Sequence, residues 1–255
     1  MTALQKWSDA RQVFVLPELG DVVLFRAELL QPENTLQHAK LLLSNDEVQR
    51  AKRFRFAPHR RRFLVARAML RTILAHYLRI GAKEVRFEYQ QHGKPKIVDS
   101  QNPSEVTFNL SHSREMAVLA VALQRQLGVD VEFIKRPLTD PGRLARRFFS
   151  EQEKAQFSQV SESQKNEAFF NCWTRKEAFI KAIGEGLTHP LRNFDVSFLP
   201  GEQAALLSTR PDASQAQQWS MHAFSAGTEY IGALAVQGPL CQLHCYQWHP
   251  EELCK

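Results

Sequence analysis

The sequence predicts an α+β fold made of a pseudo-two-fold pair of similar halves, each a small antiparallel sheet packed against a long helix. Amphipathic helical patterns and short β-rich segments occupy separate stretches of the chain. Residues 110–121 also resemble residues 224–235, and a long helix with ionic groups four residues apart precedes each copy. Chance similarity of two hairpins is the alternative. A true repeat would join the halves around residues 122–128 and place an active site in the cleft between them.

Strands and helices alternate in the first half. Runs of β-branched and aromatic residues bounded by Pro17 and Gly20 indicate strands, and Ser44 is typical of a helix cap. Apolar residues three and four apart, with arginines opposite them, indicate a second helix. The predicted strands are residues 13–16, 22–25, 85–89, 106–110 and 117–123, and the predicted helices are 34–54 and 58–78.

The second half is expected to repeat this order and to end in strands. A strand covers residues 128–133, and the polar stretch 201–216 is interpreted as a loop. The helices are predicted at 143–149, 152–160 and 167–183, and the later strands at 196–198, 219–224, 230–236 and 243–248. The two domains are therefore set at residues 1–124 and 125–255.

The helix that ends at Gly184 has one charged residue within its apolar stripe. Its apolar stripe contains Phe169, Cys172 and Phe179, and Lys176 falls inside that stripe. A buried lysine is costly unless its ammonium reaches water or an anion. Glu177 and Lys181 lie one turn apart along the edge of the stripe. This helix is therefore expected to carry chemistry along one side.

Composition limits the class of protein. The 255 residues are 44% hydrophobic and 24% charged, as in ordinary globular proteins. The net charge of +6 is uneven, because residues 50–71 hold nine lysines and arginines and no acid. Phosphates, nucleic acid or an acidic protein would suit this segment, and a merely solvated basic face is the alternative.

Targeting signals are missing from the sequence pattern. The first residues lack the basic and apolar regions of a signal peptide, and the longest apolar run, residues 116–123, is too short to span a bilayer. The four cysteines show no disulfide-framework spacing. We therefore expect a soluble cytoplasmic protein without a membrane partner.

Two carboxylates share one face of the strand at residues 128–133. Asp130 and Glu132 project together, about 6–7 Å apart at the backbone, and repel each other unless a cation neutralises them. Oxygen ligands favour Mg²⁺ or Mn²⁺ over zinc, and Glu177 could supply a third carboxylate. A solvated strand face is the alternative.

Phosphate groups around such a metal would need donors. Lys94 lies in a tight Gly-Lys-Pro turn, and Ser111 and His112 end a predicted strand. A lone histidine after a strand is more often structural, but its basic surroundings favour a role in binding. The further candidates are Arg50, Arg62, Arg67, Lys176 and Lys181.

Three segments, in this order and spacing, resemble the 4′-phosphopantetheinyl transferase superfamily, in its large, monomeric Sfp type. The resemblance extends from about Ser44 to Phe198. The matching stretches are Gly93-Lys94-Pro95 leading to Phe108-Asn109-Leu110-Ser111-His112-Ser113, then Gly128-Val129-Asp130-Val131-Glu132, and Trp173-x-x-Lys176-Glu177-Ala178-Phe179-x-Lys181-Ala182-x-Gly184-x-Gly186-Leu187.

The resemblance implies a pseudo-dimer that binds coenzyme A between its halves. Mg²⁺ would be held by Asp130, Glu132 and Glu177. Contacts to the phosphates and the adenosine part of coenzyme A are implied for Arg50, Arg62, Lys94, Ser111, His112, Lys176 and Lys181. Arg67, which stands where other members carry an acid, remains a candidate for the same site.

The implied reaction transfers the phosphopantetheine arm of coenzyme A to a serine of an acyl or peptidyl carrier protein and releases 3′,5′-ADP. Glu177 is the candidate base for the serine proton, and Lys181 would orient it. The carrier is expected to be acidic, so part of the excess positive charge would steer its docking. A monomer is expected.

Two other functions fit parts of the pattern. A Mg²⁺-dependent nuclease also combines carboxylates, a lysine and a basic surface, but here Glu177 and Lys181 lie four apart on a helix rather than alternating on a strand. A non-catalytic module that binds coenzyme A or a carrier is the second alternative. The intact set of carboxylates and Lys181 argues against it.

Overall fold

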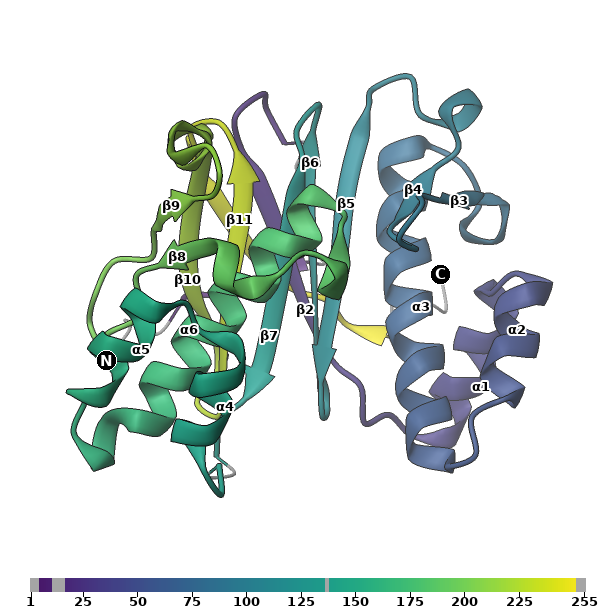
Figure 1. Cartoon of the computed structure of the whole chain (residues 1–255). Coiled ribbons are helices and arrows are strands. Elements are labelled where there is room, and N and C mark those ends of the chain that lie inside the picture. Colours follow the sequence, from purple (N-terminus) through teal and green to yellow (C-terminus); the bar gives the residue numbers. More distant parts are fainter. Residues whose placement is uncertain (1–4, 11–16, 136–137, 251–255) are drawn as a thin grey trace.

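The computed structural model describes residues 5–10, 17–135 and 138–250 (Figure 1). The predicted strand at residues 13–16 lies outside these ranges. The helices are α1 (Glu33–Leu42), α2 (Asn45–Lys52), α3 (Ala57–Leu78), α4 (Pro141–Phe148), α5 (Glu151–Ser158) and α6 (Glu162–Ile183). The strands are β1 (Ser8–Asp9), β2 (Val22–Glu28), β3 (Phe87–Tyr89), β4 (Pro95–Ile97), β5 (Val106–Ser113), β6 (Met116–Leu123), β7 (Leu127–Phe133), β8 (Phe194–Val196), β9 (Leu206–Thr209), β10 (Trp219–Gly227), β11 (Tyr230–Gln237) and β12 (Leu243–Gln247).

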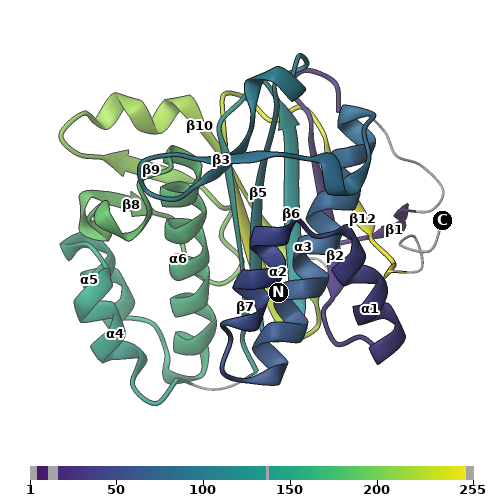
Figure 2. The same ribbon diagram turned by 90° about the vertical axis from the view of Figure 1, so that its right-hand side faces the viewer.

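Two sheets lie between two long helices. The first sheet has the strand order β1-β12-β2-β6-β5, and the second has the order β10-β11-β7. One face of the first sheet packs on α3, and one face of the second packs on α6. The inward faces share an apolar core to which β2, β6, β7 and β11 contribute. Figures 1 and 2 show α3 and α6 on the outer sides of this arrangement. The mixed α+β class predicted from sequence is confirmed.

The two sheets contain triplets of the same order. In the first, β2 pairs antiparallel with β6, and β6 with β5; in the second, β7 pairs antiparallel with β11, and β11 with β10. The hairpins β5–β6 and β10–β11 are the two segments whose sequences resemble each other. Each triplet also includes the strand that precedes the long helix of its half.

A row of polar side chains joins the triplets where β5 lies beside β7. Backbone N–H groups of β7 donate to side-chain oxygens of β5: Val129 to Asn109 (2.9 Å), Val131 to Ser111 (3.4 Å) and Phe133 to Ser113 (3.2 Å). These bonds replace a backbone ladder between the edge strands. They also set the register in which the carboxylates of β7 face the serines of β5.

Glycine at position 128 brings α6 against β7. A Cβ atom there would lie 2.2 Å from the carbonyl oxygen of Ala178 and 2.3 Å from the amide nitrogen of Ala182. Only glycine allows the strand and helix backbones to approach this closely. α6 then ends at Gly184, which takes the left-handed conformation (φ 77°) that favours glycine at a helix C-terminus.

Several boundaries differ from the predicted ones. The predicted cap at Ser44, where the helix expected at residues 34–54 restarts, is confirmed: the N–H of Ser44 donates to Glu47, and the second helix, α2, ends at Lys52 rather than Phe54. α6 begins five residues before Glu167, at Glu162. The stretch 201–216 is not wholly loop, since it contains β9 and the start of a 3-10 helix.

The tail strand β12 returns to the first sheet. It pairs parallel with β2, from Leu243 opposite Val22 to Gln247 opposite Arg26. Tyr246 and Trp248 are buried in the core beneath α3. A division of the chain at residue 124 therefore leaves one strand of the first sheet within the C-terminal segment. In the described part of the chain, no helix combines the length and apolarity needed to cross a membrane.

Candidate active site

Four of the predicted site residues come together where α6 crosses β7. Asp130 and Glu132 lie on the face of β7 that is turned toward α6, and Glu177 and Lys181 lie on the facing side of the helix. The valines between the two carboxylates are buried in the opposite core. The predicted alternation of valines and carboxylates is confirmed.

Asp130 is the most buried carboxylate of this group, with 4% of its surface exposed. Its Oδ1 accepts hydrogen bonds from Lys181 Nζ at 2.6 Å and from Ser111 Oγ at 3.0 Å. Burial raises the pKa of Asp130, and Lys181 and Ser111 offset part of that effect. The second oxygen, Oδ2, is buried without a hydrogen-bond partner.

Glu132 is held by Ser113, which the sequence reasoning did not identify. Ser113 Oγ donates to Glu132 Oε2 at 2.7 Å. Burial raises the pKa of Glu132, and the nearby charge of Asp130 adds to it, while Ser113 works in the opposite direction. The alternation Asn109-x-Ser111-x-Ser113 is the signal that could have revealed this row of side chains on one strand face.

Glu177 has the pKa of a group that can exchange a proton at neutral pH. Burial, reinforced by the charges of Asp130 and Glu132, raises its pKa to about 7, although Lys181 acts to lower it. Lys181 does not bond Glu177 in this structure. Its ammonium donates instead to Asp130, to Ser111 Oγ and to the carbonyl of Val129.

A divalent cation would suit this set of side chains. Three carboxylates face one lysine, and the partnerless Oδ2 of Asp130 is a buried oxygen with a free coordination position. The described residues contain no group of three or more His, Cys, Asp and Glu side chains already gathered around one metal position. Lys181 neutralises part of the negative charge that a cation would neutralise.

His112 and Arg62 stand beside the carboxylate group. His112 is partly exposed, and the partial burial of its ring together with the charges of Lys181, Arg62 and His59 lowers its pKa. Arg62 binds Glu115, in the turn between β5 and β6, with its Nε atom 3.1 Å from Oε1. These two side chains lie on the side of the site that the N-terminal half provides.

The prediction for Lys176 is wrong. Its side chain is fully buried, with 0% exposed, and pairs with Glu153 at 2.8 Å. It also donates to the carbonyls of Leu191 and Phe194. The anion that this buried lysine requires is therefore a carboxylate of α5, and Lys176 does not face a ligand.

Two more predicted contacts have other partners. Arg67 binds Glu47, and Arg71 binds the same carboxylate; burial alone would raise the pKa of Glu47, but the two arginines hold it below the ordinary value. Lys94 donates to the carbonyls of Leu127 and Ala182, and burial lowers its pKa to about 8. Both side chains link elements of the fold in this structure, and their contact with coenzyme A stays a prediction.

Two hollows open near the predicted site residues. Exposed Arg50, which lies over the ring of Phe63, lines a hollow of about 790 Å³ with Arg53 and Phe54. A groove of about 660 Å³ runs from Ser113 and Glu132 to α4, and its cationic side chains are Arg114, Arg143 and Arg147. Leu138, Leu144 and Phe170 add an apolar lining to this groove.

Comparison with known proteins identifies the protein family to which this chain belongs. The family model described as the 4′-phosphopantetheinyl transferase superfamily matches residues 126–235, and the model of the 4′-phosphopantetheinyl transferase N-terminal region matches residues 31–124.

Individual relatives agree with these matches. The chain is 38% identical over 231 residues to 4′-phosphopantetheinyl transferase HetI from Nostoc sp., with 91% of each chain covered. It is 30% identical over 168 residues to 4′-phosphopantetheinyl transferase Sfp from Bacillus subtilis, and the aligned region covers 66% of this chain and 71% of the relative. A mouse L-aminoadipate-semialdehyde dehydrogenase-phosphopantetheinyl transferase is 28% identical, covering 76% of this chain and 67% of the relative. This chain belongs to the 4′-phosphopantetheinyl transferase superfamily.

Proposed function

We propose that this protein transfers the 4′-phosphopantetheine arm of coenzyme A to a serine of an apo carrier protein, with Mg²⁺ as cofactor. The observation that carries the proposal is the cluster of Asp130, Glu132, Glu177 and Lys181 at the α6–β7 crossing. Its members lie in two of the three motifs shared with the family. We further propose that the two halves are related by a pseudo-two-fold axis, as their matching strand orders suggest.

The reaction is an in-line displacement at phosphorus. The serine oxygen of the carrier forms a bond to the β-phosphorus of coenzyme A, the bond to the bridging oxygen breaks, and 3′,5′-ADP leaves. Glu177 accepts the serine proton, for which a pKa near 7 is suitable. Because such transfers depend mainly on positioning and charge, Lys181 and His112 would contribute by stabilising the phosphate oxygens.

Asp130, Glu132 and Glu177 would hold the metal. When bound, Mg²⁺ supplies positive charge to phosphate oxygens and orients them. Asp130 contributes its partnerless Oδ2, and Ser113 fixes Glu132 from the side of β5. The release of the Asp130–Lys181 contact would free the ammonium for phosphate.

Metal binding without coenzyme A is expected to release protons. A carboxyl group with a pKa of about 7 is partly protonated at neutral pH, and a cation displaces that proton. Calorimetry of Mg²⁺ binding in two buffers of different ionisation enthalpy should show more release near about pH 6 than near about pH 8. The variant Glu177→Gln should lose most of it. Equal release at both pH values would contradict the assignment of Glu177.

His112→Ala is expected to weaken coenzyme A binding. Loss of a hydrogen bond to a charged phosphate costs roughly 1.5–3 kcal/mol, or about 10- to 150-fold in Kd. Calorimetry with coenzyme A measures the change. His38→Ala on α1 is the matched control, since within the described part of the chain the His38 ring bonds its own helix at the carbonyl of Asn34. An unchanged Kd for His112→Ala would place this residue outside the phosphate site.

The groove beside Glu132 is the surface we propose for an acidic carrier. It begins at Glu132 and is lined by Arg114, Arg143 and Arg147, so a carrier docked there would bring its serine to the carboxylate cluster. The protein would act as a monomer, because both halves of the site come from one chain. A reducing cytoplasmic compartment fits the free cysteines Cys172, Cys241 and Cys245.

Product analysis separates this function from its alternatives. Liberation of 3′,5′-ADP from coenzyme A that requires the acceptor serine indicates the transferase. Coenzyme A binding without any product would indicate a binding module. Mg²⁺-dependent cleavage of plain DNA or RNA would indicate a nuclease.

A further inference from the structure

We propose that Lys176 is a positioning residue for this reaction: its buried ion pair with Glu153 fixes where α6 presents Glu177 and Lys181 to β7. The proposal rests on the transferase function and concerns a side chain that touches neither substrate nor metal ligands. It assigns a role to Lys176, which the helix motif shares with the family and which lies outside the cluster of Asp130, Glu132, Glu177 and Lys181.

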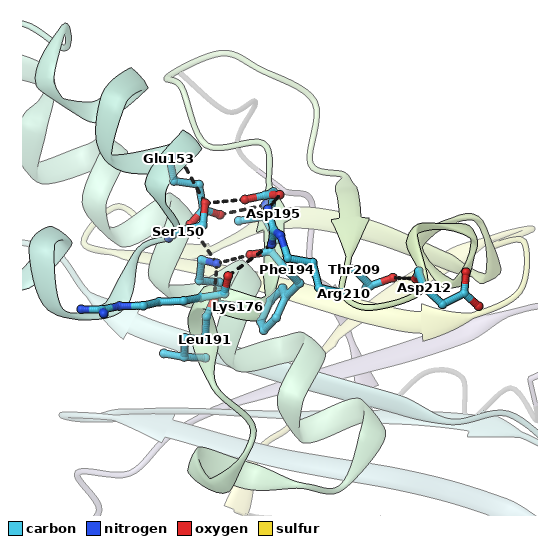
Figure 3. A network of polar contacts seen from close by, with 11 residues as sticks. Ser150, Glu153, Lys176, Leu191, Phe194, Asp195, Thr209, Arg210 and Asp212 are labelled. Carbon is cyan, nitrogen blue, oxygen red and sulfur yellow. Dashed lines mark hydrogen bonds and ion pairs between the residues drawn. The ribbon is translucent and has the colours of Figure 1, made fainter.

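The Lys176 ammonium has three polar neighbours. It forms an ion pair with Glu153 Oε2 at 2.8 Å, and it donates hydrogen bonds to the carbonyl of Leu191 at 2.7 Å and to that of Phe194 at 2.6 Å. The ammonium also lies 4.3 Å from the centre of the Phe194 ring. Figure 3 shows this group between the helices and the segment that carries Leu191 and Phe194.

Glu153 anchors the ion pair in α5 and extends the contact to β8. Its carboxylate accepts from the N–H of Ser150, at the start of α5, and from the N–H of Val196 in β8, both at 2.9 Å. Beside it, Ser150 binds Asp195, which pairs with Arg210 (Figure 3). One buried pair therefore links α6 with α5 and β8.

A contribution to the stability of the fold does not by itself explain why this ion pair is buried here. Buried ion pairs often contribute no more than apolar residues of the same volume. The surroundings here are apolar and aromatic, with Phe149, Phe169 and Phe179 in the same core. The charged pair instead restricts geometry: the ion pair with Glu153 and the hydrogen bonds around it require one axial position of α6 relative to α5 and β8.

That position matters on the opposite side of the helix. Next to Lys176 in the chain is Glu177, and one turn further Lys181 reaches Asp130 at 2.6 Å. Gly128 lets the same helix segment contact β7 through Ala178 and Ala182. A displacement of about 1 Å at a catalytic group can cost about 10²-fold in rate.

The test compares turnover with coenzyme A affinity in Lys176→Met. We expect kcat to fall about 10²-fold while the Kd for coenzyme A stays within about threefold. Both are measured below the melting temperature, with the fold checked by circular dichroism. Lys165→Met, at the other end of α6, removes a lysine paired at the surface with Glu162 and should keep wild-type turnover.

Rescue makes the test independent of simple destabilisation. Lys176→Met leaves the carboxylate of Glu153 buried without its cation. The double variant Lys176→Met/Glu153→Gln should therefore have a kcat at least about tenfold higher than that of Lys176→Met. If Lys176→Met does not fold, Glu153→Gln alone, which keeps the volume, should lower kcat about tenfold without changing the Kd.

Three results would overturn the proposal. Wild-type kcat with a lowered melting temperature would leave the pair a stabilising contact only. A Kd weakened as much as kcat would indicate direct contact with coenzyme A. Absence of rescue in the double variant would separate Lys176 from Glu153. If the wild-type protein transferred no phosphopantetheine arm, the proposed function itself would be refuted. Failure of the Lys176 proposal can therefore be distinguished from failure of the proposed function.

Discussion

Glu177→Gln is expected to lower kcat by about 10³-fold while the Kd for coenzyme A changes by less than about threefold. Glutamine keeps the size of the side chain but can neither accept the serine proton nor supply a negative ligand. The carboxylate of wild-type Glu177 has its pKa raised to about 7 by burial and by Asp130. As the base must be deprotonated, wild-type kcat/KM at low Mg²⁺ should rise as the pH increases through that range, and saturating Mg²⁺ should move the rise to lower pH because the cation displaces the proton.

A matched substitution on the same helix controls for loss of charge. Glu162→Gln, in the exposed first turn of α6, should retain wild-type turnover and affinity. Stopped-time mass spectrometry of the carrier gives kcat, and calorimetry gives the Kd. Near-normal turnover of Glu177→Gln would show that another group accepts the proton.

Gly128→Ala is expected to reduce the free energy of unfolding by about 3 kcal/mol or more. The added methyl group would meet backbone atoms of Ala178 and Ala182 at 2.2 and 2.3 Å. Neither neighbour is a flexible side chain, so α6 must move away from β7 or the strand must bend. Because the carboxylates of β7 face Glu177 across this contact, kcat should fall as well.

Urea unfolding measures the effect, and Gly142→Ala is its control. A Cβ at position 142, in the first turn of α4, would lie 3.4 Å from Asp140 Oδ1, an ordinary contact. That substitution should be neutral or stabilise the protein by up to about 1 kcal/mol. A Gly128→Ala variant within about 0.5 kcal/mol of wild type would mean that α6 does not pack this closely on β7.

The features predicted correctly from the sequence are those set by local patterns of residues along the chain. Alternation along residues 128–133 placed Val129 and Val131 in a core and Asp130 and Glu132 on the other face, as observed. Helical spacing gave α3 and α6, and Gly184 gave the end of α6. These features depend on neighbours a few residues away.

The errors arose where a distant partner decides the role of a side chain. Lys176 was assigned to a ligand because its position in an apolar stripe required an anion, and the anion proved to be Glu153, 23 positions earlier in the chain. Arg67 likewise found Glu47 on another helix. The return of β12 to the first sheet, and the bond from Ser113 to Glu132, also join segments that no local pattern connects.

Intact-mass measurement of an apo carrier protein tests the central claim most directly. The carrier is incubated with this protein, coenzyme A and Mg²⁺, beside a carrier whose acceptor serine is replaced by alanine. We predict that the wild-type carrier gains the mass of one phosphopantetheine arm and that the alanine carrier gains none. No gain on any of several acyl and peptidyl carriers, although the protein binds coenzyme A, would contradict the account.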